Sequence, residues 1–362
     1  MKRETENKMR RLFCGGAWAV ALMLCGTLSM LTFTACSDDD DDSGSAEDLV
    51  ESSYIRGTDG EVYHLVGIGK SSKPYYYYSY DYDDEGYLEG FSDNYEWDFD
   101  FEVTSYSPFA FSTGDSYEQS SFNSISINGS GYITKFTATY TEEDDDYEEK
   151  LTLSCSYSGG HLTKISGSGK VAYDGYSMSE TMTVTLSWSG DYLTQYHYYA
   201  KGSGSGYTAW IDETVKYDYD EKEYYNAAMQ YTPNIFESTM LPEVAYIFPT
   251  PLMYIGYFGQ GPAYLPEAYS YEGEEYEKEE DDEDDDEYSD EGSYSYVFNS
   301  NGTVKSAGGY YFTYEEFEND TDDDEYAAFR ISLAEEENPE TERERRTLRS
   351  MFQEYLQKRL TK

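Results

Sequence analysis

Histidine is rare in this chain, and common signatures of catalysis are missing. Only 3 of the 362 residues are His, and none has a companion at His-x-x-x-His or Cys-x-x-Cys spacing, so we expect no zinc site. The sequence has no Gly-x-Ser-x-Gly elbow and no phosphate-binding glycine loop. Its 73 acidic residues make close carboxylate pairs inevitable by chance, so they give no signal for glycoside hydrolysis. We therefore predict a noncatalytic protein without a cofactor.

Positive charge is scarce as well. The chain has 25 Lys and Arg against its 73 acidic residues, and the net charge of -48 repels the phosphates of nucleic acids. This charge excludes nucleic-acid binding. A chain so acidic would be disordered if it lacked aromatic residues, but 43 Tyr, 17 Phe and 4 Trp can build a core.

The N-terminus has the three parts of a secretory signal. Basic residues precede an apolar segment over 12–33, and small residues then lead to Cys36. This pattern resembles the bacterial lipoprotein signal, in which the cysteine is acylated after export. We predict a signal peptide over 1–35, a lipid on Cys36 and an acidic tether over 36–52, where five consecutive aspartates repel one another. The alternative is an uncleaved transmembrane helix.

We predict no intrachain disulfide, because only one cysteine remains available for pairing. Cys14 and Cys25 leave with the signal peptide and Cys36 carries the lipid, so Cys155 is alone. It has the same parity as the apolar residues of 151–157, which places it on the buried face of a strand. We expect a packing residue and not a nucleophile.

Hydrophobic residues recur mainly with a period of two residues, which is typical of strands with one solvent-exposed face. Apolar and polar residues alternate over 132–140 and 181–188. Glycines with a polar neighbour precede the restart of each strand, as at Gly131, Gly160 and Gly190. These units predict a mostly β fold over 53–333, an antiparallel meander of hairpins that forms a curved sheet or a partly open barrel.

Two tyrosine-aspartate units carry a family resemblance. Residues 80–88 and 217–220 resemble the hairpins of Bacteroidota lipoproteins in a domain-of-unknown-function family with a porin-like, curved antiparallel sheet. The resemblance covers 53–320 and implies no catalytic residues. The polar strand faces and the lack of a regular aromatic girdle argue against a membrane pore. The Cys-Ser-Asp start also resembles the signal for the outer face of the outer membrane, with a periplasmic location as the alternative.

Two segments interrupt the hairpin pattern. Residues 228–268 hold six of the nine prolines, and their apolar residues can plug the open end of the sheet or line a ligand cleft. Plugging is the interpretation we favour. Residues 272–291 contain fifteen acidic residues, which predicts a disordered acidic insertion.

The end of the chain changes to helical spacing. Asn338 can cap a helix and Pro339 suits its first position, so we predict an amphipathic helix over 338–362. Its apolar stripe is expected to dock on the sheet while its arginines face acidic loops. The alternative is binding to an anionic lipid surface.

Two sets of residues are candidate sites. Four tyrosines share one strand face and would form an exposed platform for sugars or peptides, namely Tyr76, Tyr78, Tyr80 and Tyr82. Cross-strand aromatic pairing that stiffens the sheet is the competing interpretation, and it is the one we favour for the row itself. Asp81, Asp83 and Glu85 copy the first half of a calcium-binding loop, although Ser92 stands where the bidentate glutamate belongs.

Taken together, these features predict a lipid-anchored binding module of the cell surface that captures glycans or polypeptides. The alternative from another class is a structural acidic envelope protein without a discrete ligand. An unrecognised hydrolase is the third.

Overall fold

The computed structural model describes ten stretches of the chain, and these are residues 44–70, 76–93, 99–113, 118–142, 147–173, 175–204, 206–219, 224–278, 283–317 and 346–360. The chain divides into two units, Met1–Asp42 and Ser43–Lys362, and all of these residues belong to the second. The predicted signal peptide, Cys36 and Asn338 lie outside the described residues. Each helix within the described residues is too short or too polar to cross a lipid bilayer.

Most of the described chain is β-strand. The first half contains β1 (Ile55–Arg56), β2 (Val62–Lys70), β3 (Tyr76–Tyr82), β4 (Leu88–Asp93), β5 (Phe99–Tyr106), β6 (Phe109–Thr113), β7 (Glu118–Ile127), β8 (Ile133–Glu142), β9 (Tyr147–Ser158) and β10 (His161–Tyr173). The second half contains β11 (Tyr176–Ser189), β12 (Tyr192–Gly204), β13 (Tyr207–Asp218), β14 (Tyr224–Tyr225), β15 (Tyr264–Leu265), β16 (Ala268–Lys278), β17 (Glu283–Ser293), β18 (Tyr296–Phe298), β19 (Val304–Ala307) and β20 (Tyr310–Glu316).

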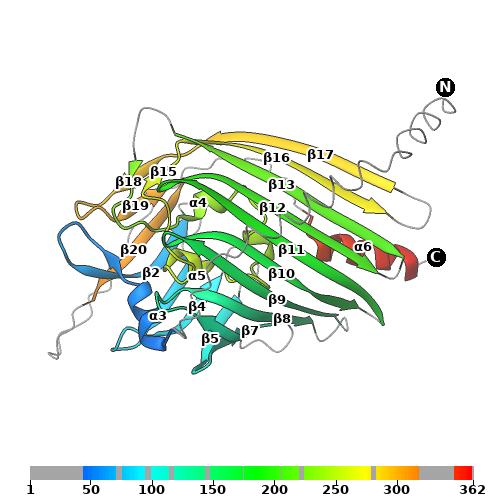
Figure 1. The fold of residues 1–362 in the computed structure, drawn as a ribbon, viewed down its shortest axis with the longest axis horizontal. Helices are drawn as coiled ribbons and strands as arrows, with labels where there is room; N and C mark the ends of the chain where they lie inside the picture. Colours follow the sequence, from blue (N-terminus) through cyan, green and yellow to red (C-terminus); the bar gives the residue numbers. More distant parts are fainter. Residues whose placement is uncertain are drawn as a thin grey trace, which may run out of the picture. The chain divides into compact units, whose positions relative to one another are not determined.

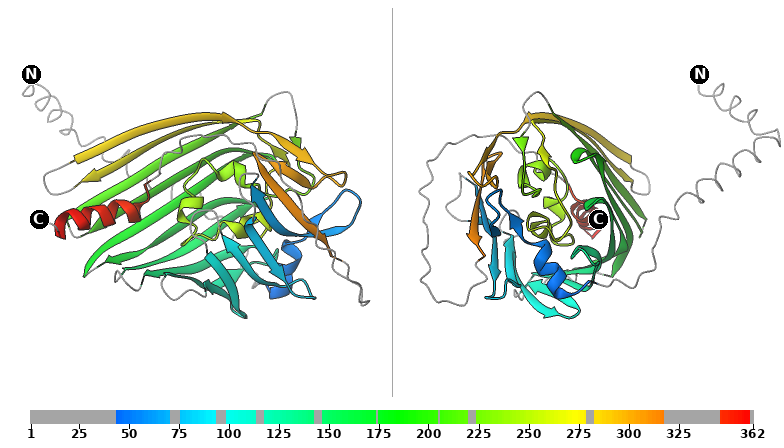
Figure 2. Two further views of the ribbon diagram at one scale, coloured as in Figure 1. Left: turned by 180° about the vertical axis from the view of Figure 1, so that it is seen from behind. Right: turned by 60° about the vertical axis from the view of Figure 1, so that its left-hand side comes forward.

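Eighteen of the described strands form one antiparallel meander, and β14 and β15 form a separate two-stranded sheet. Each strand from β2 to β13 pairs with the next, and β16 and β17 extend the sheet beyond β13. At the other end β20 pairs with β2, followed by β19 and β18. No ladder among the described strands joins β17 to β18, so the sheet is curved but not closed (Figures 1 and 2). The predicted fold class is confirmed.

Alternation along the strands decides which side chains face inward. In β9 every second residue is buried, including Leu151, Leu153 and Cys155. Cys155 is a free, buried thiol, as the parity of its neighbours predicts. Burial raises its pKa to about 12, which suppresses the reactive thiolate.

The predicted hairpin turns are present. Gly131, Gly160 and Gly190 have φ angles of 75°, 85° and 59° at turns between consecutive long strands. This left-handed region is costly for residues with a Cβ, which explains glycine at these positions.

The proline-rich segment fills the inside of the curve (Figure 2). It contains α4 (Pro233–Phe236), the 3₁₀ turn η1 (Pro242–Val244) and α5 (Pro251–Tyr254), each with proline in its first turn. Its large apolar side chains are buried in the same core as the strands, and they include Phe236, Leu241, Phe248, Leu252 and Phe258. These residues plug the sheet, whereas Met253, Tyr254 and Ile255 of the same segment also line a pocket.

The described parts of the predicted acidic insertion, 272–278 and 283–291, are not disordered, and the prediction was wrong for them. Residues 268–278 and 283–293 are the paired strands β16 and β17. The edge of β13 supplies a complete ladder for β16, in which Ile211 lies opposite Glu275. Tyr271 is buried against the core, and Lys216 Nζ lies 2.8 Å from Glu272 Oε1. Sheet pairing and inward rings therefore outweigh the repulsion among the carboxylates.

The two helices outside the sheet also differ from the prediction. Helix α3 (Ala46–Ser52) stands where the end of the acidic tether was expected, because Ser45 and Asp48 form a capping box and Leu49 is buried. Helix α6 (Leu348–Leu360) begins later than 338, since Arg346 and Thr347 are not helical. Its predicted docking stripe is confirmed by the buried residues Leu348, Met351, Phe352, Tyr355 and Leu356.

Candidate functional site

The tyrosine row on β3 is not an exposed platform. Tyr78 and Tyr80 are 1% and 3% exposed, which contradicts the predicted sugar-binding face. Tyr80 donates a 2.8 Å hydrogen bond to the carbonyl of Pro251, and the Tyr78 ring lies 5.2 Å from that of Tyr254. The proline-rich segment thus covers this face, a contact that strand periodicity alone does not reveal. Tyr82 is half-buried and donates to the carbonyl of Leu65, while the Tyr76 side chain lies outside the described residues.

The calcium candidate is a hairpin turn. Asp83 Oδ1 accepts hydrogen bonds from the backbone N–H groups of Glu85 and Tyr87, at 2.9 and 2.8 Å. Asp81 and Glu85 are exposed. The Asp83 carboxylate therefore stabilises the turn between β3 and β4. Within the described stretches, no group of three His, Cys, Asp or Glu side chains is placed to hold a metal ion.

Another cluster of tyrosine rings, three half-buried and one exposed, lies at a part of the fold that the sequence patterns do not mark. We call it the ring patch, and it consists of Tyr192, Tyr219, Tyr225 and Tyr264. The rings of Tyr192 and Tyr264 stack in parallel with centroids 4.6 Å apart and an interplanar angle of 5°. Tyr219 meets Tyr192 edge-on at 5.0 Å, and Tyr225 lies 5.6 Å from Tyr264. Tyr225 is 58% exposed, an unusually large exposure for an aromatic side chain in this protein.

The ring patch combines four separate parts of the chain. Tyr192 begins β12, Tyr219 follows the end of β13, and Tyr225 and Tyr264 pair across β14 and β15. Two hydrogen bonds hold this arrangement. The hydroxyl of Tyr219 donates a 2.7 Å hydrogen bond to the carbonyl of Leu193, and the backbone N–H of Ala263 donates one to the carbonyl of Asp191. No periodic signal in the sequence marks these residues, because the β14–β15 ladder alone brings two of them together.

A pocket of about 350 Å³ lies at another part of the proline-rich segment. Its walls come from α3, β1, the turn between β7 and β8, and the proline-rich segment. Tyr54 and Tyr132 present half-buried rings, and Glu51, Arg56 and Gln260 add exposed polar groups. The proline-rich segment connects pocket and ring patch, since Gln260 lines the first and Tyr264 belongs to the second.

His161 anchors the chain between these two features. Its ring stacks on Trp188 at 4.1 Å, and its Nδ1 lies 3.0 Å from the carbonyl oxygen of Gln260. The backbone N–H of Gln260 in turn donates a 2.9 Å hydrogen bond to the carbonyl of Gly160. The histidine therefore has a structural role that positions one wall of the pocket.

A pair of buried glutamates lies inside the sheet. Glu149 on β9 and Glu180 on β11 are 1% and 5% exposed. Glu180 faces Gly169 on one neighbouring strand and Gly202 on the other, so neither strand places a side chain directly opposite it. Burial raises the pKa of Glu149 to about 7, and burial together with the charge of Glu149 raises that of Glu180. Neither glutamate lines the pocket described above.

Comparison with known proteins yields one weak likeness. No family model matches the chain, and no curated protein matches it. Among solved structures the chain is similar to a porin-like protein from Bacteroides uniformis ATCC 8492, with 13% sequence identity and a TM-score of 0.23. The match covers 56% of this chain and 93% of that chain. A likeness at this level supports no statement about function.

Proposed function

We propose that this protein is a noncatalytic binding module of the bacterial envelope, anchored by a lipid on Cys36, which captures glycans or polypeptides at the ring patch. The stacked, half-buried rings of Tyr192 and Tyr264, extended by the exposed ring of Tyr225, are the observation that carries this proposal. Aromatic faces in water offer apolar area with little conformational entropy to lose, which suits the C–H faces of sugars and extended peptide chains.

The neighbouring pocket adds groups that can confer selectivity. Glu51 and Arg56 supply charges of opposite sign, and Gln260 supplies an amide. Binding sites commonly combine apolar contact area with a few polar groups that orient the ligand. We expect the ring patch to contribute contact area and the pocket to accept a polar end group.

The binding test uses a double variant of the ring patch. Tyr225→Ser with Tyr264→Ser should weaken binding of a glycan or peptide selected on arrays by about tenfold or more, since one aromatic contact contributes about 0.5–1.5 kcal/mol. Tyr311→Ser is the matched control, because Tyr311 is 36% exposed on β20 and belongs to no part of the patch. Equal binding by the double variant and the wild type would exclude the ring patch as the site.

The anchor has a separate test. Intact mass of the membrane-extracted protein should show a chain that begins at Cys36 and carries acyl groups. A mass that includes residues 1–35 without acyl chains would contradict the lipoprotein assignment, while leaving the ring patch open to the binding test.

One observation favours the structural alternative. The outer face of β16 and β17 carries exposed carboxylates at Glu272, Glu274, Asp285, Glu287 and Glu291. Such a surface would be hydrated and would respond to divalent cations without a discrete ligand. A wild-type protein that binds nothing on glycan and peptide arrays, but whose thermal stability rises gradually with millimolar Ca²⁺, would support this alternative.

A further inference from the structure

The pocket beside the proline-rich segment has a lining from which a class of ligand can be inferred, and this inference rests on the proposed function. Its volume of about 350 Å³ lies at the lower end of the range of roughly 300–1,000 Å³ for small-molecule sites. A single sugar ring with its hydroxyl groups suits a pocket of this size. The walls of the pocket and its polar groups decide between a sugar and the end of a polypeptide.

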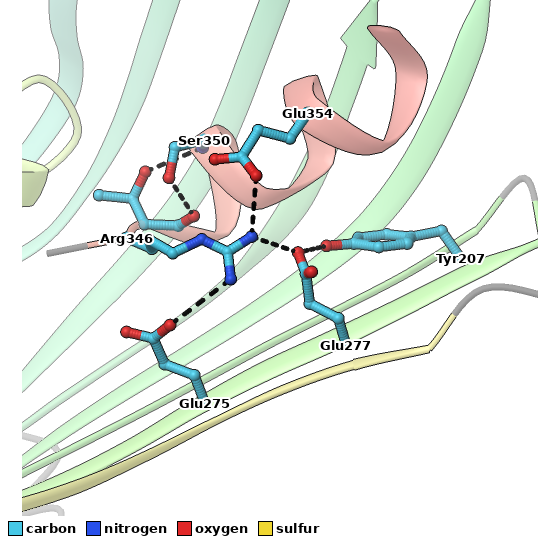
Figure 3. A network of polar contacts seen from close by, with 7 residues as sticks. Tyr207, Glu275, Glu277, Arg346, Ser350 and Glu354 are labelled. Atoms are coloured by element: carbon cyan, nitrogen blue, oxygen red, sulfur yellow. Dashed lines mark hydrogen bonds and ion pairs between the residues drawn. The ribbon is translucent and has the colours of Figure 1, made fainter. Parts of the chain in front are cut away.

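At the opposite end of the long strands, where α6 packs on β12 and β13, polar groups are paired within the chain (Figures 1 and 3). Arg346 lies 2.9 Å from Glu277 Oε1 on β16 and 3.1 Å from Glu354 Oε2 on α6. The Tyr207 hydroxyl donates a 2.7 Å hydrogen bond to the same Glu277 carboxylate. The charges at the α6 end therefore hold the fold together, whereas polar groups at the α3 end face a cavity.

Close backbone contacts fix α3 as one wall of the pocket. A Cβ at Gly131 would collide with the carbonyl of Asp48, and a Cβ at Gly256 would collide with that of Ser52. The Ser52 hydroxyl donates a 3.1 Å hydrogen bond to the carbonyl of Gly131. This wall is thus formed before any ligand arrives, which lowers the entropic cost of binding.

The second wall is a loop in a strained conformation. Met229 has a φ of 48°, in the left-handed region that is costly for a residue with a Cβ. Asn226 Nδ2 holds the loop with 2.8 Å hydrogen bonds to the carbonyls of Gln230 and Pro262. Gln230 Nε2 in turn donates a 3.1 Å hydrogen bond to the carbonyl of Tyr254. Strained backbone that its surroundings hold in place is typical of ligand sites.

Two aromatic rings of the lining are supported by other rings. The centroid of Tyr54 lies 5.4 Å from those of His64 and Phe317. The centroid of Tyr132 lies 5.3 Å from that of Tyr157. Both lining rings are half-buried, so each keeps part of its surface available. Such fixed rings offer apolar area to the C–H face of a sugar.

The polar lining includes both signs of charge. Glu51 supplies a carboxylate that accepts hydrogen bonds, Arg56 supplies a guanidinium that donates them, and the amide of Gln260 does both. Hydroxyl groups can pair with all three, because a hydroxyl is both donor and acceptor. A terminal ammonium would be repelled by Arg56, and a terminal carboxylate would be repelled by Glu51. The net charge of -48 also opposes anionic ligands, so the lining favours a neutral polyhydroxyl compound.

We propose that this pocket binds the terminal residue of a neutral glycan, whose following residues extend to the ring patch. Gln260 of the pocket and Tyr264 of the ring patch are four positions apart, so their Cα atoms are separated by at most about 15 Å. An oligosaccharide of a few residues spans this distance. The protein then captures glycans by their ends, because the buried residues Met253 and Ile255 line the inner side of the pocket.

Methyl glycosides test the pocket by itself, since one sugar residue is too small to bridge pocket and ring patch. The probes are the methyl glycosides of glucose, mannose, galactose and N-acetylglucosamine, with glucuronic acid and the dipeptide Ala-Ala for comparison. In ligand-detected NMR titrations of the full-length protein in detergent, at least one neutral glycoside should bind saturably. Glu51→Ala with Gln260→Ala should weaken that binding by about tenfold or more, because two polar partners are lost.

Both substituted side chains are exposed, so the sheet should be retained, which circular dichroism checks. Glu61→Ala is the matched control, because Glu61 is an exposed carboxylate outside the pocket lining, and it should bind like the wild type. The pocket assignment is overturned if the Glu51→Ala, Gln260→Ala variant keeps wild-type affinity, or if no neutral glycoside binds. Saturable binding of Ala-Ala in place of the glycosides would overturn the ligand class.

The double variant of the ring patch separates this inference from the proposed function. Tyr225→Ser with Tyr264→Ser should bind the methyl glycoside like the wild type, but should bind an array-selected oligosaccharide more weakly. A loss of methyl glycoside binding in this folded variant would overturn the pocket as the site of the terminal residue. Unchanged oligosaccharide binding would instead exclude the ring patch, while the glycoside titrations still decide the role of the pocket.

Discussion

The hydroxyl of Tyr147 donates a 2.6 Å hydrogen bond to Oε2 of Glu149, inside a sheet where both side chains are almost fully buried. Glu180 and Tyr246 face the same carboxyl group. Tyr198 lies close enough for the charges of both glutamates to raise its pKa. This cluster gives the stability of the protein a dependence on pH that runs against the usual behaviour of surface acids.

The pH prediction follows from the raised pKa of Glu149. Its pKa is about 7 in the folded protein against 4.5 for an ordinary glutamate, so the folded state keeps a proton that the unfolded state has released between these values. This contribution to stability is fully present below pH 4.5 and is lost as pH rises through about 7. The free energy of unfolding should fall by up to about 1.4 kcal/mol for each pH unit in this window.

Variants at the pair provide the measurement. Glu180→Gln removes the neighbouring charge and can donate a hydrogen bond to Glu149, so urea unfolding between pH 5 and 8 should show a shallower decline. Glu148→Gln changes an exposed residue on the same strand and should leave the slope unchanged. Equal slopes for the wild type and Glu180→Gln would contradict the assignment.

The proline-rich plug predicts a large packing effect. The Phe248 side chain is fully buried, and its ring lies 4.9 Å from Phe258 and 6.2 Å from Phe136 on β8. Phe248→Ala should lower the free energy of unfolding by about 3–5 kcal/mol, because it leaves a cavity between sheet and plug. Val297→Ala, at a residue that is 51% exposed, should change it by less than about 0.5 kcal/mol. Chemical denaturation measures both, and a loss below about 1 kcal/mol for Phe248→Ala would mean that the segment does not form the core.

The acidic hairpin predicts a stabilising charge reversal. Glu274 lies directly opposite Glu287 on β17 and opposite Asp212 on β13. Glu274→Lys should raise the free energy of unfolding by about 0.2–1 kcal/mol for each pair, since opposite charges replace like charges across the strands. Glu274→Gln removes the repulsion alone and should give a smaller gain. The gain should shrink in 1 M NaCl, where screening acts over about 3 Å. A salt-independent effect would point to packing and not to charge.

Local patterns predicted the elements that depend on neighbouring residues in the chain. The alternation over 181–188 became β11, and glycines such as Gly190 adopt the positive φ that a tight hairpin needs. The burial of Cys155 followed from strand parity, because successive side chains of a strand point to opposite faces. The apolar stripe of α6 is equally local, since helical spacing alone places its residues on one face.

The sequence predicted the boundaries of helices and strands less well than their presence. The acidic residues of β16 and β17 repel one another in isolation, and only the free edge of β13 makes a strand their best conformation. The later start of α6 depends on Thr347 as its cap, while Arg346 turns toward Glu277. Both outcomes depend on partners far away in the sequence.

The sequence by itself determined the class of fold, an antiparallel meander of hairpins with a C-terminal helix, because period and turn chemistry act over a few residues. Only the tertiary structure decided which tyrosines are exposed. Tyr78 and Tyr80 are buried because the proline-rich segment packs on β3, whereas Tyr225 is exposed because β14 and β15 present it at the surface. Exposure is a property of what packs against a side chain, and in this protein the packing partners lie more than a hundred residues away, as the hydrogen bond from Tyr80 to Pro251 illustrates.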